Sequence, residues 1–179
     1  MSKINANSVS LAGEFAVLAQ LALRGFDANM TLGRTKSVDI LVSDPRNGQM
    51  YKLEVKTNYK NNVDRLRKSK IHGCFLSDWI MNKKHETIMS PNLFYAFVNI
   101  SKDDNTFRYY VVPSSVVAKY VKEQHICWLK ADHKKAIKEG DMRIFRIGRR
   151  GEQCPISIPT EEQYKDNWKF NSTTSETGS

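Results

Sequence analysis

The sequence predicts a mixed α/β fold in which a central mixed β-sheet is flanked by helices. Three observations lead to this expectation. Apolar residues recur at helical spacing near the N-terminus, two segments of alternating residues flank a turn, and two runs of aromatic and β-branched residues follow further along the chain. Helical and strand segments of this kind in one chain are typical of a sheet that carries helices on its faces.

The first element that we expect is a helix over residues 8–25. Its apolar residues are spaced by three and four positions, as on one face of an α-helix: Leu11, Phe15, Leu18 and Ala22. Ser8 or Ser10 is a suitable N-cap. Gly25 is a suitable end for this helix.

After the helix we expect a short strand over residues 26–31, and then a β-hairpin. Residues 36–43 alternate, with Val38, Ile40 and Val42 on one side. The cluster Asp44-Pro45-Arg46-Asn47-Gly48 specifies a chain reversal. Residues 50–57 are therefore expected to return antiparallel to residues 36–43.

The rest of the chain completes the α/β pattern. We expect a basic loop or short helix after Thr57, a second hairpin with strands at 93–100 and 107–112, a strand at 142–147, and helices at 77–86, 116–125 and 160–168. No linker divides the sequence, so residues 1–170 are predicted to form a single domain. Residues 171–179 contain no apolar side chain and are predicted to be a flexible tail.

The composition points to a polyanionic partner. The chain of 179 residues carries 28 Lys and Arg against 19 Asp and Glu, a net charge of +9, and such an excess favours nucleic acid or merely aids solubility. The three cysteines do not form a disulfide framework. Because no run of apolar residues is long enough for a membrane span or a signal peptide, we expect a cytoplasmic protein with no membrane contact.

Acidic and basic residues gather around the first hairpin. Glu54 and Lys56 are two apart in the second strand and therefore share a face, while Leu53 and Val55 point to the other. Asp39 lies in the first strand, where Asp is uncommon and costly to bury unless it is paired or bound to a cation. If Asp39 and Glu54 converge, their oxygens can hold Mg²⁺, with the Val55 carbonyl as a further ligand.

This constellation resembles the PD-(D/E)xK nuclease superfamily, also called restriction-endonuclease-like, over about residues 8–112. The residues that carry the resemblance are Asp39, the Glu54-Val55-Lys56 run after a turn, and Glu14 in the preceding helix; Val38 stands where the family name has Pro. The resemblance implies a restriction-endonuclease-like core of helix, meandering strands, crossover helix and strand. It also implies a DNA endonuclease that uses Mg²⁺ or Mn²⁺ and works as a homodimer.

In that family the Asp and Glu bind the metal and the Lys assists the attacking water. Carried over, these roles fall on Asp39, Glu54 and Lys56, with Glu14 as an accessory catalytic ligand. The basic residues that follow are candidates for phosphate contact: Lys60, Arg65, Arg67, Lys68 and Lys70. Weaker candidates are Lys83, Lys84, His85, Arg143, Arg146, Arg149 and Arg150.

Plainer readings stay open for each motif. Glu14 also suits the N-terminal half of a helix, and Glu54 with Lys56 also suits an exposed salt bridge. Two His-x-Cys pairs, at 72–74 and 125–127, are a weak match to zinc sites. The alternatives to an endonuclease are a catalytically inactive nucleic-acid-binding protein of the same fold and a small α/β interaction module.

Overall fold

The computed structural model describes residues 4–31, 38–133 and 138–170, so the predicted tail at 171–179 lies outside the described residues. The elements follow in the order α1 (Ala6–Ala22), β1 (Asp27–Met30), β2 (Ile40–Asp44), β3 (Gln49–Lys60), β4 (Arg67–Ser69), β5 (Gly73–Phe75), β6 (Ser77–Asn82), the 3₁₀ helix η1 (Lys83–Glu86), β7 (Leu93–Ser101), β8 (Phe107–Pro113), α2 (Ser114–Lys130), β9 (Met142–Ile147) and α3 (Glu161–Tyr164).

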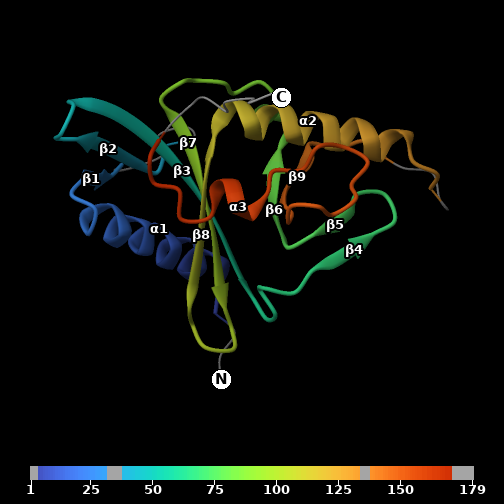
Figure 1. Cartoon of the computed structure of the whole chain (residues 1–179), viewed down its shortest axis with the longest axis horizontal. Coiled ribbons are helices and arrows are strands. Elements are labelled where there is room, and N and C mark those ends of the chain that lie inside the picture. The colour runs from blue at the N-terminus through green and yellow to red at the C-terminus, as the bar shows by residue number, and fades with distance from the viewer. Residues whose placement is uncertain (1–3, 32–37, 134–137, 171–179) are drawn as a thin grey trace.

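A five-stranded mixed sheet forms the centre of the fold, in the order β1-β2-β3-β7-β8. Strands β3 and β7 run parallel, whereas the other neighbouring pairs are antiparallel. Helices α1 and α2 lie on opposite sides of this sheet, with β6 and β9 on the side of α2 (Figure 1). The predicted class, a mixed α/β fold with a central sheet flanked by helices, is confirmed.

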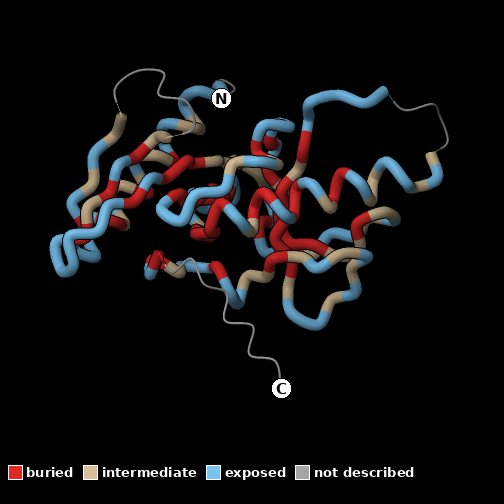
Figure 2. The backbone as a smooth tube through the Cα atoms, turned by 90° about the horizontal axis from the view of Figure 1, so that it is seen from above, coloured by how far each residue is buried: buried red, intermediate tan, exposed pale blue. Residues whose placement is uncertain are grey.

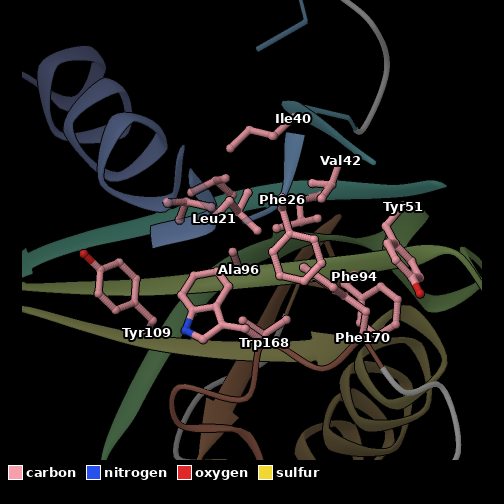
Figure 3. Packing of buried hydrophobic residues seen from close by; sticks show 14 of the residues in the cluster. Leu21, Phe26, Ile40, Val42, Tyr51, Phe94, Ala96, Tyr109, Trp168 and Phe170 are labelled. Carbon is pink, nitrogen blue, oxygen red and sulfur yellow. The ribbon is translucent and has the colours of Figure 1, made fainter. Parts of the chain in front are cut away.

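The face of the sheet toward α1 carries the first hydrophobic core. Val17 and Leu21 of α1 are completely buried against apolar residues of all five strands. The C-terminal segment closes this core, because the Phe170 ring lies among Phe26, Tyr51 and Phe94 (Figure 3). Its centroid is 4.8 Å from that of Tyr51 and 5.2 Å from that of Phe94, within the range of favourable ring pairs.

The opposite face carries a second core beneath α2, β6 and β9. Its centre is aromatic, with the rings of Phe97 and Phe145 stacked at 4.2 Å and Trp79 beside them. Every residue of β7 is buried, and Figure 2 shows the buried residues concentrated in the middle of the molecule. A strand buried on both faces reads as a continuous apolar run rather than an alternating one.

The two hairpins are where the sequence placed them. Strands β2 and β3 are antiparallel, as are β7 and β8. In β3, Leu53 and Val55 belong to the α1-side core, while Glu54 pairs in register with Tyr95, a member of the opposite core. The predicted division of this strand into an apolar face and a charged face is confirmed.

The helix predicted at 77–86 is wrong. Residues Ser77–Asn82 form β6, which pairs antiparallel with β9, and only Lys83–Glu86 are helical, as one 3₁₀ turn. Ser77, Trp79 and Met81 are buried while the residues between them are not, so the period is two. As a result, the connection between β3 and β7 contains strands and a 3₁₀ turn in place of the crossover helix that the resemblance implied.

Helix α1 also differs from its prediction. Asn5 is the N-cap, accepting from Ser8 N at 2.8 Å, and Leu11 and Phe15 are 44% and 56% exposed. The face that packs on the sheet contains Gly13, Val17 and Leu21 instead. At the far end of the chain, the predicted helix 160–168 is a single turn, α3.

Other expectations need smaller changes. The basic segment after Thr57, expected as a loop or short helix, begins and ends in strands. Strand β3 continues to Lys60, and β4 pairs with β5. Helix α2 extends past the predicted 116–125. No helix among the described residues has the length and apolar character that a membrane span requires.

A close approach of α1 to β3 depends on Gly13. A Cβ atom at this position would lie 1.9 Å from Thr57 Oγ1 and 2.8 Å from its Cγ2. We expect Gly13→Ala to lower the free energy of unfolding by about 1 to 3 kcal/mol, as overpacking does, measured by urea denaturation. At an exposed helical position the same change stabilises by about 0.5 to 1 kcal/mol, and that sign would contradict the contact. The double variant Gly13→Ala/Thr57→Ala is expected to recover part of the loss.

Candidate active site

The candidate site lies where the pairing of β2 with β3 ends. The last backbone hydrogen bond between the two segments joins Asp39 N to the Leu53 carbonyl, at 2.8 Å. The next amide of β3 that points toward β2, Val55 N, donates instead to the side chain of Asp39, with Oδ2 at 2.6 Å. Because Val55 N points toward Asp39, the Val55 carbonyl faces the same edge of β3. Beyond this point the edge of β3 is no longer covered by β2.

Glu54 is the most deeply buried of the four predicted catalytic residues, at 3% exposed. Its Oε1 lies 2.6 Å from Lys56 Nζ and 3.2 Å from His85 Nε2. His85 Nδ1 lies 3.1 Å from Asn82 N and 2.9 Å from Asn82 O, and these two contacts orient the ring so that Nε2 faces Glu54. Burial alone would raise the pKa of Glu54, but the His85 hydrogen bond and the Lys56 charge outweigh it and lower the pKa to about 2.

The second carboxylate oxygen of Glu54 is also buried. Neither Oε2 nor the nearby Tyr95 hydroxyl makes a hydrogen bond of standard geometry with a described residue. Burial, the charge of Glu54 and a side-chain interaction with Glu54 nevertheless raise the pKa of Tyr95. The hydroxyl therefore keeps its proton and can donate it to the Glu54 carboxylate.

The carboxylates of Asp39 and Glu14 interact electrostatically with one another and with Lys56. Burial raises the pKa of Asp39, and the negative charge of Glu54 raises it further. The Val55 hydrogen bond and the positive charges of Lys56 and Lys84 partly oppose this rise. Burial likewise raises the pKa of Glu14, and repulsion from Asp39 adds to the rise. Glu14 also accepts from Ser10 Oγ at 3.1 Å. The structure thus brings the four predicted catalytic residues into one electrostatic cluster, while their roles stay predictions.

The donor set suits Mg²⁺ rather than a metal that needs many protein ligands. No group of three or more His, Cys, Asp or Glu side chains able to hold a metal occurs in the described ranges, which also leaves the two His-x-Cys pairs without support as a zinc site. Mg²⁺ usually takes one or two carboxylates and keeps several waters. Asp39, Glu54 Oε2 and the Val55 carbonyl match that pattern, and a cation would offset the repulsion between the carboxylates.

The predicted phosphate-binding residues separate into two groups. Lys60 and Arg67 are engaged by other residues, since Lys60 Nζ donates to Ser77 Oγ at 2.5 Å and Arg67 Nη2 lies 2.5 Å from Asp78 Oδ1. Three others are exposed and make no ion pair with any residue in the described ranges: Arg65, Lys68 and Lys70. Only this second group offers free cations to a polyanion.

The weaker basic candidates are also divided by burial. Arg143 and Arg146 are 2% and 6% exposed, so they are not on the outer surface, and Arg149 is paired with Glu161. His85 was predicted only as a surface cation, yet it is buried on Glu54. The sequence signal that locates it is the Asn82-x-x-His85 spacing, which forms a capping box at η1.

Comparisons with known proteins add little to this geometry. Neither a protein-family model nor a curated protein sequence matches the chain. Among solved structures, a match is a bacterial homing endonuclease, I-Ssp6803I, at 13% sequence identity and a TM-score of 0.47, covering 93% of this chain and 90% of that one. The function is therefore inferred from the side chains of the site.

Lys60 gives a pH-dependent prediction. Burial, followed by the charge of Arg67, lowers its pKa from 10.5 to about 8. Between these values the unfolded chain binds more protons than the folded protein, so the free energy of unfolding should rise with pH across this window. Urea denaturation from about pH 7 to about pH 10 measures it. Lys60→Met should remove the rise, whereas Lys52→Met, at an exposed site of the same strand, should retain it. Equal profiles for all three proteins would contradict the burial.

Proposed function

We propose that the chain is a Mg²⁺-dependent DNA endonuclease of the restriction-endonuclease-like kind. The observation that carries the proposal is the meeting of Asp39, Glu54 and Lys56 at the uncovered edge of β3. Two carboxylates beside one ammonium group are what phosphodiester hydrolysis needs, because the reaction develops negative charge on phosphoryl oxygens and activates a water. The resemblance to PD-(D/E)xK nucleases rests on the same residues.

Each residue has a task that follows from its surroundings. Glu54 is ionised at neutral pH, as a metal ligand must be. Lys56 and His85 hold its Oε1, so Oε2, near the Tyr95 hydroxyl, is the oxygen that we assign to the metal. Asp39 is fixed by Val55 N. Bound Mg²⁺ supplies charge neutralisation at the phosphate and lowers the pKa of a coordinated water.

Lys56 is the residue that can reach both the carboxylate and solvent. Its Nζ contacts Glu54 Oε1, and its side chain is 29% exposed. It can therefore orient an attacking water or contact a phosphoryl oxygen without leaving Glu54 uncompensated. The family resemblance gives Glu14 the role of an accessory ligand. Its interactions in the site are electrostatic, with Asp39 and Lys56, and it forms no three-carboxylate metal group with Asp39 and Glu54 among the described residues.

The proposed substrate is DNA, approached through the exposed cations of the segment after β3. Arg65, Lys68 and Lys70 carry charges that no described acidic residue neutralises, and phosphate neutralisation by such side chains releases counterions. The proposal includes a homodimer, as the family resemblance implies, because cutting both strands of a duplex takes two sites.

Cleavage of supercoiled plasmid, branched DNA and single-stranded DNA tests the activity. We expect wild-type protein to cut at least one of these with Mg²⁺ and none with EDTA. Asp39→Asn keeps an acceptor for Val55 N, and Glu54→Gln keeps the side-chain shape, yet each should lower the rate at least about 100-fold, the scale for losing a charge-stabilising group. Lys56→Ala should act similarly.

Lys52→Ala is the matched control for Lys56→Ala, since Lys52 lies on the same face of β3 and is exposed. Its rate should equal that of wild type. Equal cutting by wild type and Glu54→Gln would overturn the assignment of the site. DNA binding without Mg²⁺-dependent cutting of any substrate would favour the inactive nucleic-acid-binding alternative.

Salt dependence tests the DNA-contacting surface. The slope of log K against log salt should become shallower by about 0.9 for each duplex phosphate contact that is lost. We expect this change for Arg65→Gln and Lys68→Gln in fluorescence anisotropy titrations. Arg67→Gln should change the slope less, because its guanidinium is already paired with Asp78. Identical slopes in all variants would place the DNA on another surface.

A further inference from the structure

A pocket of about 300 Å³ lies between the end of α2 and strand β9, apart from the residues of the candidate active site. Basic and aromatic side chains line it together with the apolar side chains of Met142 and Ile144. The residues that line it and carry the inference are His72, His125, Trp128, Lys138, Arg143 and Arg146. None of these residues has a role in the proposed hydrolysis.

Three of the lining side chains are more than nine-tenths buried and have unused polar atoms. Arg146 is 6% exposed, and its Nε and Nη1 have no hydrogen-bond partner among the residues that the structure describes. His72 and His125 are each 7% exposed, with His72 Nδ1 and His125 Nε2 likewise without a hydrogen bond. Such groups are normally paired, so a pocket that collects four of them lacks its partner.

The charge of Arg146 is not balanced within the described chain. No described carboxylate lies within 4 Å of its guanidinium, whereas Arg143 is held by Glu86. Asp78, opposite Arg146 in the β6–β9 ladder, is already used by Arg67 and Lys60. The guanidinium interacts with the Tyr120 hydroxyl and lies 5.1 Å from the Phe75 ring, and neither of these groups carries a negative charge. A buried cation without a counter-ion is unfavourable, and an anion in the pocket would remove the penalty.

One acidic residue stands at the rim. Glu139 Oε1 lies 3.6 Å from His125 Nε2 and 3.9 Å from Arg143 Nη2, but its side chain is 55% exposed. It therefore does not fill the pocket or reach Arg146. With Lys138 also at the opening, the balance around the pocket stays positive.

We propose that this pocket is a binding site for a phosphate-class oxyanion, with Arg146 as its main ligand and His72 and His125 as hydrogen-bonding partners. A guanidinium offers donors that match the oxygens of phosphate, and imidazole can donate once its free nitrogen is protonated. The volume suits a single oxyanion or the terminal phosphate of a small molecule or a nucleic-acid end, since it lies at the small end of ligand pockets. A duplex cannot enter it.

Binding of inorganic phosphate to the full chain tests the site. The melting temperature and calorimetric titration are compared between potassium phosphate and potassium chloride at equal ionic strength and pH. We expect wild type to bind with a dissociation constant of about 1 mM or tighter. Arg146→Gln should bind at least about tenfold more weakly. Arg150→Gln, an exposed arginine four residues further on, is the control and should bind like wild type.

A second measurement keeps the test independent of how the Arg146 variant folds. The imidazole NMR signals of His72 and His125 in wild type should shift on addition of phosphate. No shift and no calorimetric signal in wild type would overturn the proposal, as would unchanged affinity in folded Arg146→Gln. Competition by a 5′-phosphorylated oligonucleotide but not by its unphosphorylated twin would identify a nucleic-acid end as the source. Binding of inorganic phosphate without such competition would identify a free anion or small phosphate ester.

Discussion

The hydrogen bond from Val55 N to Asp39 Oδ2 is the point on which the candidate site depends. A side chain here takes the place that a backbone carbonyl of β2 would occupy, so the ladder stops while β3 continues to Lys60. Hydrogen bonds to a charged group contribute about 1.5 to 3 kcal/mol, so this contact holds the two segments firmly. The same bond fixes a carboxylate beside the uncovered edge of β3, where the proposed metal ligands lie.

The surroundings of the site act differently on the pKa values of its three carboxylates. Lys56 and His85 stabilise the charge of Glu54, whereas burial and mutual repulsion disfavour the charges of Asp39 and Glu14. The Glu54–Lys56 pair is not the exposed salt bridge that the sequence also allowed, because Glu54 is almost fully buried. The proposed cation would offset the repulsion between Asp39 and Glu14.

The sequence predicts those parts of the structure whose signal is local. Alternation around Asp44-Pro45-Arg46-Asn47-Gly48 located the first hairpin and the charged face of β3, and both are confirmed. It failed for β6, because the partner that makes Ser77–Asn82 a strand is β9, far along the chain. The sequence predicted the helix α1 but not the face that packs on the sheet. Close packing on Thr57 places Gly13 on this face, and the more apolar face with Leu11 and Phe15 is exposed. The sequence also did not predict His85 as a partner of Glu54. As with β6, the contact joins residues far apart in the sequence, 31 positions in this case.

The short helix η1 connects the candidate active site to the basic pocket. His85 contacts Glu54, and the next residue, Glu86, pairs with Arg143, which lines the pocket. A single 3₁₀ turn has few bonds of its own, so these two contacts and the capping box with Asn82 hold it in place. A change at His85 or Glu86 thus alters both sites at once. Asp39 and Arg146 each belong to one site only, which makes them the residues whose variants separate catalysis from anion binding.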